Sequence, residues 1–184
     1  MSNGPRIAID GAQSTGKTTL WTELQDHYGS KLLFIREAAR AIAADFGIFE
    51  AADWPSLLSD VPRLAAFFAA EEEWQLTQEL SGSGFVSDSS LYLIQAYKVA
   101  FGFPVDDAVL KRARYDVLFH CTNVNPFTPD GFRFVAHREQ VDLEYRKIIT
   151  NCCTGRIVEL TKDNRADVAR AIIDGAIDEG RREG

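Results

Sequence analysis

Short apolar runs alternate along the chain with longer segments in which apolar residues recur about every 3.6 positions. The short runs are almost continuously apolar, which is typical of parallel strands covered on both faces. We therefore expect strands at residues 6–10, 32–35, 85–86, 117–121 and 156–160. Because helical segments separate these runs, the pattern predicts an α/β fold with a doubly wound, five-stranded parallel sheet.

The helical segments are bounded by recognisable end signals. The helix after the first strand ends at the Tyr28-Gly29 pair. The Ala-rich segment beyond the second strand is expected to be helical to about Asp45. Further helices are expected at residues 62–80, at 91–101, in the segment that carries Arg146 and Lys147, and from Asp163 or Asn164 through Ile177.

The longest helical segment, residues 62–80, has two candidate faces. The first is an apolar stripe of Leu64, Ala65, Phe68, Gln75 and Leu76. The second contains Phe67, Glu71, Trp74 and Gln78. Aromatic and amide side chains can clamp a flat ring, so Trp74 and Gln78 are candidate contacts for a ring-shaped small molecule. The alternative interpretation is ordinary core with a solvated edge.

The first predicted strand leads directly into a glycine-rich loop. Residues 11–18 spell Gly-Ala-Gln-Ser-Thr-Gly-Lys-Thr, a complete Walker A sequence between a strand and a helix. The backbone N–H groups of such a loop hold nucleotide phosphates, Lys17 reaches the β- and γ-phosphates, and the Thr18 hydroxyl binds Mg²⁺. A nucleotide that carries Mg²⁺ is therefore the expected ligand of this loop. The predicted nucleotide contacts are Gly11, Ala12, Gln13, Ser14, Thr15, Gly16, Lys17, Thr18 and Thr19.

Composition and charge narrow the class of protein. With 46% apolar and 26% charged residues, the 184-residue chain is expected to form one domain over residues 1–184. A net charge of −7 gives no general attraction to nucleic acid or anionic membranes, which favours a small acceptor. No apolar leader or membrane span is visible, and three cysteines lack any ligand spacing, so a cytoplasmic protein is expected. The cysteines, His120 and His137 are interpreted as structural residues; the oligomeric state stays open.

Two predicted strands end next to carboxylates. Glu37 and Arg40 follow the second strand, and Asp88 follows the third. Because the carboxyl ends of parallel strands meet at one edge of a sheet, these side chains can face the P-loop. Glu37 is either an acceptor contact or a favourable charge at an exposed helix start. Asp88 is either a Walker B carboxylate that serves Mg²⁺ or, like its neighbouring serines, a helix cap.

An irregular stretch at residues 122–138 follows the fourth strand. Prolines at 126 and 129 and the Asp-Gly pair at 130–131 break any regular pattern. We expect a lid-like loop in which Arg133, with Arg138 at its end, closes over the phosphates and neutralises developing charge. The alternative is a solvated surface loop. Together with Arg146 and Lys147, these arginines are also the one candidate basic face for DNA.

The order of these segments resembles a known family. GAQSTGKTTL, REAAR, GFVSDSSLYLIQAYKVAFG, RYDVLFHCTNVNPFTPDGFRF and HREQ occur in the order seen in small, AAA-like P-loop kinases grouped around the ribosylnicotinamide kinase domain of the bacterial NAD-biosynthesis regulator. Phage kinases that phosphorylate hydroxymethyluracil in DNA belong to the same broad group. The resemblance covers nearly the whole chain, and the P-loop is its sharpest motif.

The resemblance implies phosphoryl transfer from ATP to a hydroxyl on a nucleoside- or nucleotide-kinase fold with strand order 2-3-1-4-5. In related deoxynucleoside kinases, a glutamate just after the second strand acts as base, and Glu37 occupies the matching place. In those kinases an arginine comes directly after the carboxylate at the end of the third strand, but here Ser89 follows Asp88. The positive group must therefore come from elsewhere, either Arg40 or the Arg133 loop.

The predicted catalytic residues are Lys17, Glu37, Asp88 and Arg133, with Thr18 and Asp88 as metal ligands. The sequence leaves open whether Glu37 or Asp88 is the base. It also leaves three functions: a kinase of a nucleoside-like or nucleotide-like molecule, a kinase of a hydroxymethyl-pyrimidine base within DNA, or a regulatory P-loop ATPase.

Overall fold

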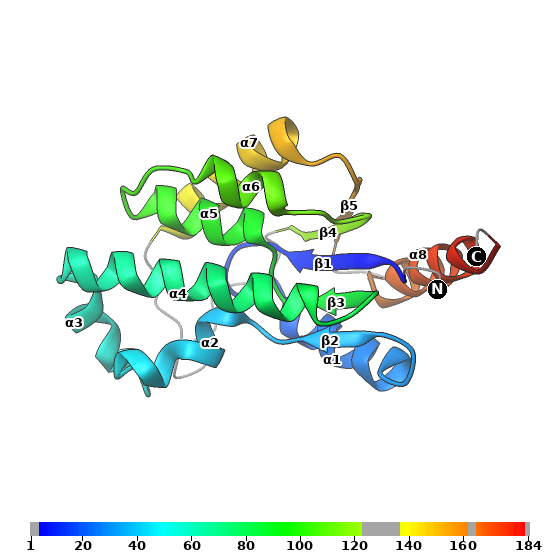
Figure 1. Ribbon diagram of the computed structural model, residues 1–184, viewed down its shortest axis with the longest axis horizontal. Coiled ribbons are helices and arrows are strands. Elements are labelled where there is room, and N and C mark those ends of the chain that lie inside the picture. Colours follow the sequence, from blue (N-terminus) through cyan, green and yellow to red (C-terminus); the bar gives the residue numbers. More distant parts are fainter. Residues whose placement is uncertain (1–3, 123–136, 162–164, 183–184) are drawn as a thin grey trace.

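The computed structural model of the protein describes residues 4–122, 137–161 and 165–182 (Figure 1). At its centre lies a parallel sheet of five strands, β1 (Arg6–Asp10), β2 (Leu33–Ile35), β3 (Phe85–Ser87), β4 (Val117–Cys121) and β5 (Arg156–Leu160). The strand order is β2-β3-β1-β4-β5. The predicted α/β fold and its strand order are therefore confirmed.

Helices connect the strands. They are α1 (Lys17–Tyr28), α2 (Ala38–Ile42), α3 (Trp54–Leu58), α4 (Val61–Leu80), α5 (Leu91–Ala100), α6 (Asp107–Arg112), α7 (Arg138–Cys152) and α8 (Arg165–Arg182), with 3₁₀ turns at Ala43–Phe46 and Ala51–Asp53. The short α3 and α6 were not predicted, and α8 continues beyond Ile177. None of the helices in the described ranges is both long and apolar enough to cross a membrane.

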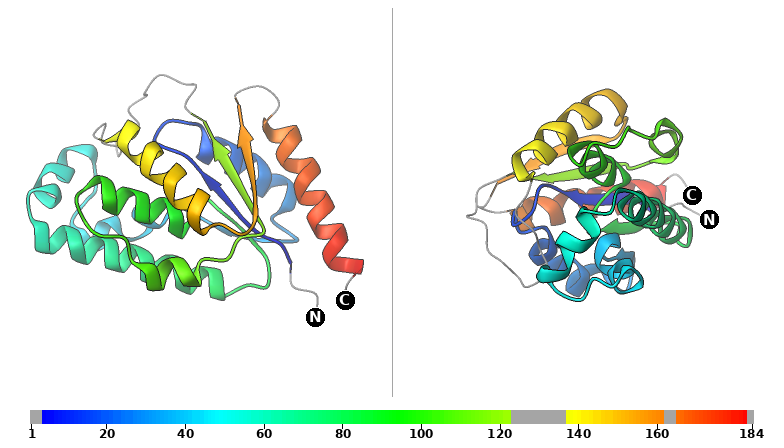
Figure 2. Two further views of the ribbon diagram at one scale, coloured as in Figure 1. Left: turned by 90° about the horizontal axis from the view of Figure 1, so that it is seen from above. Right: turned by 90° about the vertical axis from the view of Figure 1, so that its left-hand side faces the viewer.

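The central strand β1 is buried on both faces. Successive side chains of a strand point to opposite sides, so Ile7 and Ile9 pack with α1 and α8, whereas Ala8 packs with α5 and α7. Figure 2 shows α8 on one side of the sheet and α5 and α7 on the other. This double burial explains why the strand runs are continuously apolar. Asp10 lies two residues after Ala8 on the same strand, so its side chain also points to the side of the sheet covered by α5 and α7.

Helix α4 differs most from its predicted pattern. Of the expected stripe, only Ala65 is exposed, and the other four members are buried. The buried surface also spreads to the second stripe and to several polar side chains. Its further members are Phe67, Glu71, Glu72 and Glu79. The reason is that α4 packs against α2 and α3 near its start and against α5 along its length, so more than one face is covered.

The residues interpreted as structural have ordinary packing roles. All three cysteines are free thiols that lie in or against the cores on the two sides of the sheet. His120 is buried with its Nε2 3.2 Å from Asp142 Oδ1. His137 immediately precedes α7, where its ring packs edge-on against Phe101.

Candidate active site

The loop between β1 and α1 has a backbone that only glycine accommodates at two positions. Gly11 has φ 143° and Gly16 has φ 85°, both in the region that residues with a Cβ avoid. A Cβ on Gly11 would lie 2.4 Å from the carbonyl oxygen of Cys121, at the end of β4. A Cβ on Gly16 would lie 2.4 Å from Nη1 of Arg165. The loop is therefore held closely between the end of β4 and the start of α8.

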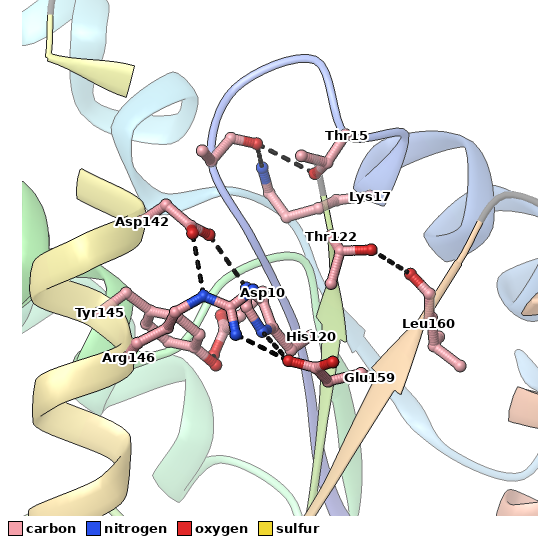
Figure 3. Close-up of polar contacts among 11 residues, drawn as sticks. Asp10, Thr15, Lys17, His120, Thr122, Asp142, Tyr145, Arg146, Glu159 and Leu160 are labelled. Carbon is pink, nitrogen blue, oxygen red and sulfur yellow. Dashed lines mark hydrogen bonds and ion pairs between the residues drawn. The ribbon is translucent and has the colours of Figure 1, made fainter. Parts of the chain in front are cut away.

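Lys17 and Thr15 are anchored inside this loop. The Lys17 ammonium donates a hydrogen bond to the carbonyl oxygen of Ala12 at 3.2 Å, and the Thr15 hydroxyl donates to the same oxygen at 3.0 Å (Figure 3). The Lys17 side chain is only 3% exposed. A positive charge is thus placed beside the N-terminus of α1, whose first backbone N–H groups have no partner within the helix. This combination of lysine, loop and helix start suits the phosphates of a nucleotide. Thr19, the last predicted contact, is exposed on α1.

Arg165 contacts the P-loop, although the sequence did not mark it as a residue of the site. Its Nη1 donates a hydrogen bond to the carbonyl oxygen of Thr15 at 2.8 Å, although 150 residues separate the two. The guanidinium covers Gly16, which explains the close approach at that position. No sequence motif marks this arginine, because its contact depends on how α8 returns to the P-loop edge of the sheet.

Thr18 and Asp88 meet at the centre of the candidate site. The Thr18 hydroxyl donates a hydrogen bond to Asp88 Oδ2 at 2.8 Å, which joins α1 to the end of β3. The backbone N–H of Asp88 donates to the carbonyl oxygen of Ile35 at 2.8 Å, so the ends of β2 and β3 also lie together. Hydroxyl and carboxylate oxygens are the ligand types that Mg²⁺ prefers. The pair therefore fits the metal site expected beside a Walker A loop.

The structure assigns the helix-capping role to Ser90. The Ser90 hydroxyl accepts a hydrogen bond from the backbone N–H of Leu93 at 3.2 Å, which caps α5. We predicted that either Asp88 or a neighbouring serine caps this helix, and the structure has the serine as the cap. The Thr18–Asp88 contact is present as well. Asp88 is not needed as the cap.

Glu37 lies at the neighbouring strand end. It lies two residues beyond the end of β2 and directly before α2, and its Oε2 accepts a hydrogen bond from Arg40 Nε at 2.8 Å. The two side chains remain partly accessible, at 21% and 35% exposure. Since β2 is paired with β3, the structure places Glu37 and Arg40 at the same sheet edge as Asp88.

The predicted acceptor contacts on α4 have different surroundings. Trp74 is half-buried and packs against the cores on both sides of α4, which matches the ordinary-core interpretation. Gln78 is half-buried next to Glu79, whose carboxylate lies 3.8 Å from the Arg6 guanidinium at the start of β1. The P-loop follows the opposite end of β1. Gln78 is therefore not brought together with the P-loop.

The arginines of the predicted lid are only partly described. Arg138 is the half-buried first residue of α7. Arg133, the Asp-Gly pair before it and most of the predicted lid lie outside the described residues, as do the proposed helix caps Asp163 and Asn164.

The sequence was also compared with known proteins. A family model described as "AAA domain" matches residues 6–171, which is most of the chain. The chain belongs to this family of AAA domains. No curated protein matches the sequence.

Three solved structures share the fold of this AAA domain. A NadR protein in complex with NR has a TM-score of 0.71 at 17% identity, covering 95% of this chain and 52% of its own. A NadR protein with NAD and AMP-PNP has a TM-score of 0.64 at 19% identity, covering 96% of this chain and 49% of its own. Thymidylate kinase from Candida albicans has a TM-score of 0.64 at 17% identity, covering 94% and 92%. The AAA domain thus spans about half the length of the NadR chains.

A buried carboxyl group on α4 adds an unexpected titratable group to this region. Glu71 is only 6% exposed, and burial raises the pKa of its carboxyl to about 8, with further contributions from the charges of Glu37 and Glu72. Lys98 opposes this shift, but its ammonium pairs with Glu72 at 2.5 Å. The helical pattern includes Glu71 in a stripe but cannot show that its carboxyl is buried near Glu37.

We expect Glu71→Gln to reduce the loss of stability as pH rises from about 5 to 9. Folded Glu71 holds its proton up to a pKa of about 8, whereas an unfolded glutamate releases it near 4.5. The contribution of Glu71 to the free energy of unfolding is therefore fully present below the pKa of the unfolded state, and it is lost as the pH rises through the pKa of the folded state. Between pH 5 and 9 the wild type should therefore lose about 2–4 kcal/mol more of its free energy of unfolding than the variant does, measured with urea.

The exposed neighbour Glu73 supplies the matched control for that comparison. Glu73→Gln should follow the wild-type pH dependence, because the carboxyl it replaces is solvated. Equal pH slopes for Glu71→Gln and the wild type would show that the Glu71 carboxyl is ionised in the folded protein throughout this range.

Proposed function

We propose that the protein is an ATP- and Mg²⁺-dependent kinase that transfers the γ-phosphate to a hydroxyl of a nucleoside-like small molecule. The observation that carries the proposal is the hydrogen bond of 2.8 Å between Thr18 of the Walker A loop and Asp88 at the end of β3. Support comes from the fold, which is shared with thymidylate kinase and with NadR proteins in complex with NR or AMP-PNP.

In this proposal, the nucleotide is held by the loop from Gly11 to Thr19. Lys17 supplies the positive charge for the β- and γ-phosphates, and backbone N–H groups supply the fixed donors. Thr18 and Asp88 would hold Mg²⁺, which when bound neutralises charge on the phosphate oxygens. Arg165 braces the loop through the Thr15 carbonyl. Phosphoryl transfer requires little covalent chemistry from the protein, so positioning should dominate catalysis.

The acceptor is proposed to bind beside Glu37. Its carboxylate oxygen is oriented by Arg40 Nε at 2.8 Å, and both side chains are partly accessible. Glu37 would accept the proton of the acceptor hydroxyl, a task worth roughly 10²–10⁴-fold in rate. Asp88 is the alternative base, but its contact with Thr18 favours the metal role. Arg40 or Arg133 would then provide the positive group that Ser89 cannot.

Charge pairing favours a small acceptor over DNA. Arg146 pairs with Asp142 at 2.9 Å and with Glu159 at 2.7 Å, so its charge is neutralised within the fold (Figure 3). Lys147 likewise pairs with a glutamate one turn away at 2.9 Å. These two residues of the candidate basic face therefore contribute little net positive charge. The net charge of −7 also disfavours binding to DNA.

The first test replaces the P-loop lysine. Lys17→Ala should lower the transfer rate at least ~10²-fold, because a preorganised positive donor to the phosphates is lost. Far-ultraviolet circular dichroism should stay unchanged, and Lys111→Ala, which changes an exposed lysine on α6, should retain full turnover. Wild-type turnover by folded Lys17→Ala would rule out the assignment of the P-loop.

A second test separates the two carboxylates. Asp88→Asn should weaken the response to Mg²⁺ and slow both transfer and background ATP hydrolysis, since the metal site is impaired. Glu37→Gln should lower transfer by about 10²-fold or more while nucleotide affinity stays nearly unchanged, as expected for a base.

Steady-state kinetics and equilibrium nucleotide titration measure these two effects, with the exposed Glu73→Gln as control. The roles would be reversed if Glu37→Gln lost ATP affinity and kept its transfer rate. ADP release that does not require any acceptor would instead indicate a regulatory ATPase.

A third test identifies the acceptor class. Transfer to free nucleosides should be almost independent of salt, because an uncharged nucleoside releases no counterions on binding. Transfer to a base in duplex DNA should fall with a log–log slope of about −0.9 for each phosphate contacted. We expect activity on a panel of free nucleosides and modified nucleosides. Activity confined to DNA containing the same modified base, and lost as salt rises, would overturn the small-acceptor assignment.

A further inference from the structure

The last residue of β1, Asp10, is a fully buried carboxylate with three hydrogen-bond donors around it. Its Oδ1 accepts from the backbone N–H of Ser90 at 2.7 Å. Its Oδ2 accepts from the Ser90 hydroxyl at 2.6 Å. The same oxygen accepts from the Tyr145 hydroxyl at 2.8 Å, and Figure 3 shows Asp10 beside Tyr145. A buried carboxylate is costly unless it is hydrogen-bonded in this way. Two of the three bonds go to Ser90, two residues beyond Asp88.

The segment that Asp10 holds is a sharp turn with an unfavourable backbone. Ser89 has φ 132°, a value that residues with a Cβ rarely adopt, and it is 5% exposed. The turn is also held from the side of α4, where Gln75 Nε2 donates to the Ser87 hydroxyl at 2.9 Å and to the Ser89 carbonyl at 3.4 Å. A strained conformation of this kind persists only where surrounding contacts impose it.

The turn and the P-loop are therefore tied to the same strand. Asp10 is followed directly by Gly11, so β1 leads through the P-loop to Thr18, which contacts Asp88. Through its carboxylate, Asp10 also holds Ser90 on the other side of Asp88. A metal ligand must be kept within about 0.5 Å of its working position by such supporting bonds.

We propose that Asp10 is a positioning residue that holds the Asp88 turn against the P-loop through its two hydrogen bonds to Ser90. The inference rests on the proposed function, in which Asp88 binds Mg²⁺. The competing explanation is purely structural, because the same carboxylate also ties α7 to the sheet through Tyr145. The two explanations differ in what happens when only one set of bonds is removed.

The test measures the affinity for AMP-PNP by calorimetry, in excess Mg²⁺ and in EDTA, for each variant. The ratio of the two affinities is the metal enhancement. Asp10→Asn should lower it by about 10-fold, as is usual when a residue supporting a metal ligand is changed. The affinity in EDTA should change little, because the amide alters the turn and not the phosphate donors.

Tyr145→Phe is the matched control, because it removes the third hydrogen bond at Asp10 and leaves both bonds to Ser90. It should lower the melting temperature without changing the metal enhancement. Should Asp10→Asn fail to fold, Ser90→Ala replaces it. This change removes one of the two bonds to Asp10 together with the cap of α5, and it should give about a 3-fold decrease in the metal enhancement.

Asp88→Asn distinguishes failure of this inference from failure of the proposed function. If Asp88→Asn loses the metal enhancement but the folded Asp10 or Ser90 variant keeps it, Asp10 is merely structural and the inference is overturned. A metal enhancement that Asp88→Asn retains would remove Asp88 from the metal site, and the inference would fall together with that part of the proposed function. An equal loss of metal enhancement in Tyr145→Phe would also favour the structural explanation.

Discussion

The burial of β1 on both faces is the constraint on which the rest of the structure depends. A strand with no solvated face must have helices on both sides, and parallel neighbours with helical crossovers satisfy that requirement. All five strands then end at the same edge of the sheet. The P-loop after β1, Glu37 after β2 and Asp88 after β3 are gathered by this geometry rather than by any direct attraction among them.

Buried carboxylates dominate the electrostatics at the carboxyl ends of the strands and along helix α4. Burial raises the pKa of Asp10, although hydrogen bonds from Ser90 and Tyr145 oppose the shift. Burial likewise raises the pKa of Glu79 to about 7, while bonds from Gln75 and Tyr115 act the other way. Such groups reduce stability relative to an apolar core, and natural proteins usually retain them near functional sites. In the described part of the chain they lie on β1, on α4 and at Asp88 itself, and β1 and α4 are the two elements that support the Asp88 turn.

Pairing between neighbouring charges limits where the protein can attract an anion. The hydrogen bonds of Arg146 to two carboxylates raise its pKa further above the ordinary arginine value, so it stays charged but is locally neutralised. Lys17 differs because its ammonium donates to a backbone carbonyl rather than to a carboxylate. The loop that carries Lys17 is consequently a place where fixed donors and a positive charge that is not paired with a carboxylate coincide. A compact anion such as a nucleotide phosphate suits that loop better than an extended polyanion does.

Local patterns in the sequence determined the five strands, the longer helices and the Walker A loop, because each depends on residues close together in the chain. The parallel topology then placed Glu37 and Asp88 at one edge, which sequence reasoning could anticipate from strand ends alone. The short helices α3 and α6 escaped prediction, since helices of this length are marginal without tertiary contacts. Only the tertiary structure decided that Arg165 reaches Thr15, that Glu71 is buried, and that Asp10 holds Ser90. These contacts join residues far apart in the sequence, so their existence depends on packing that no local pattern records.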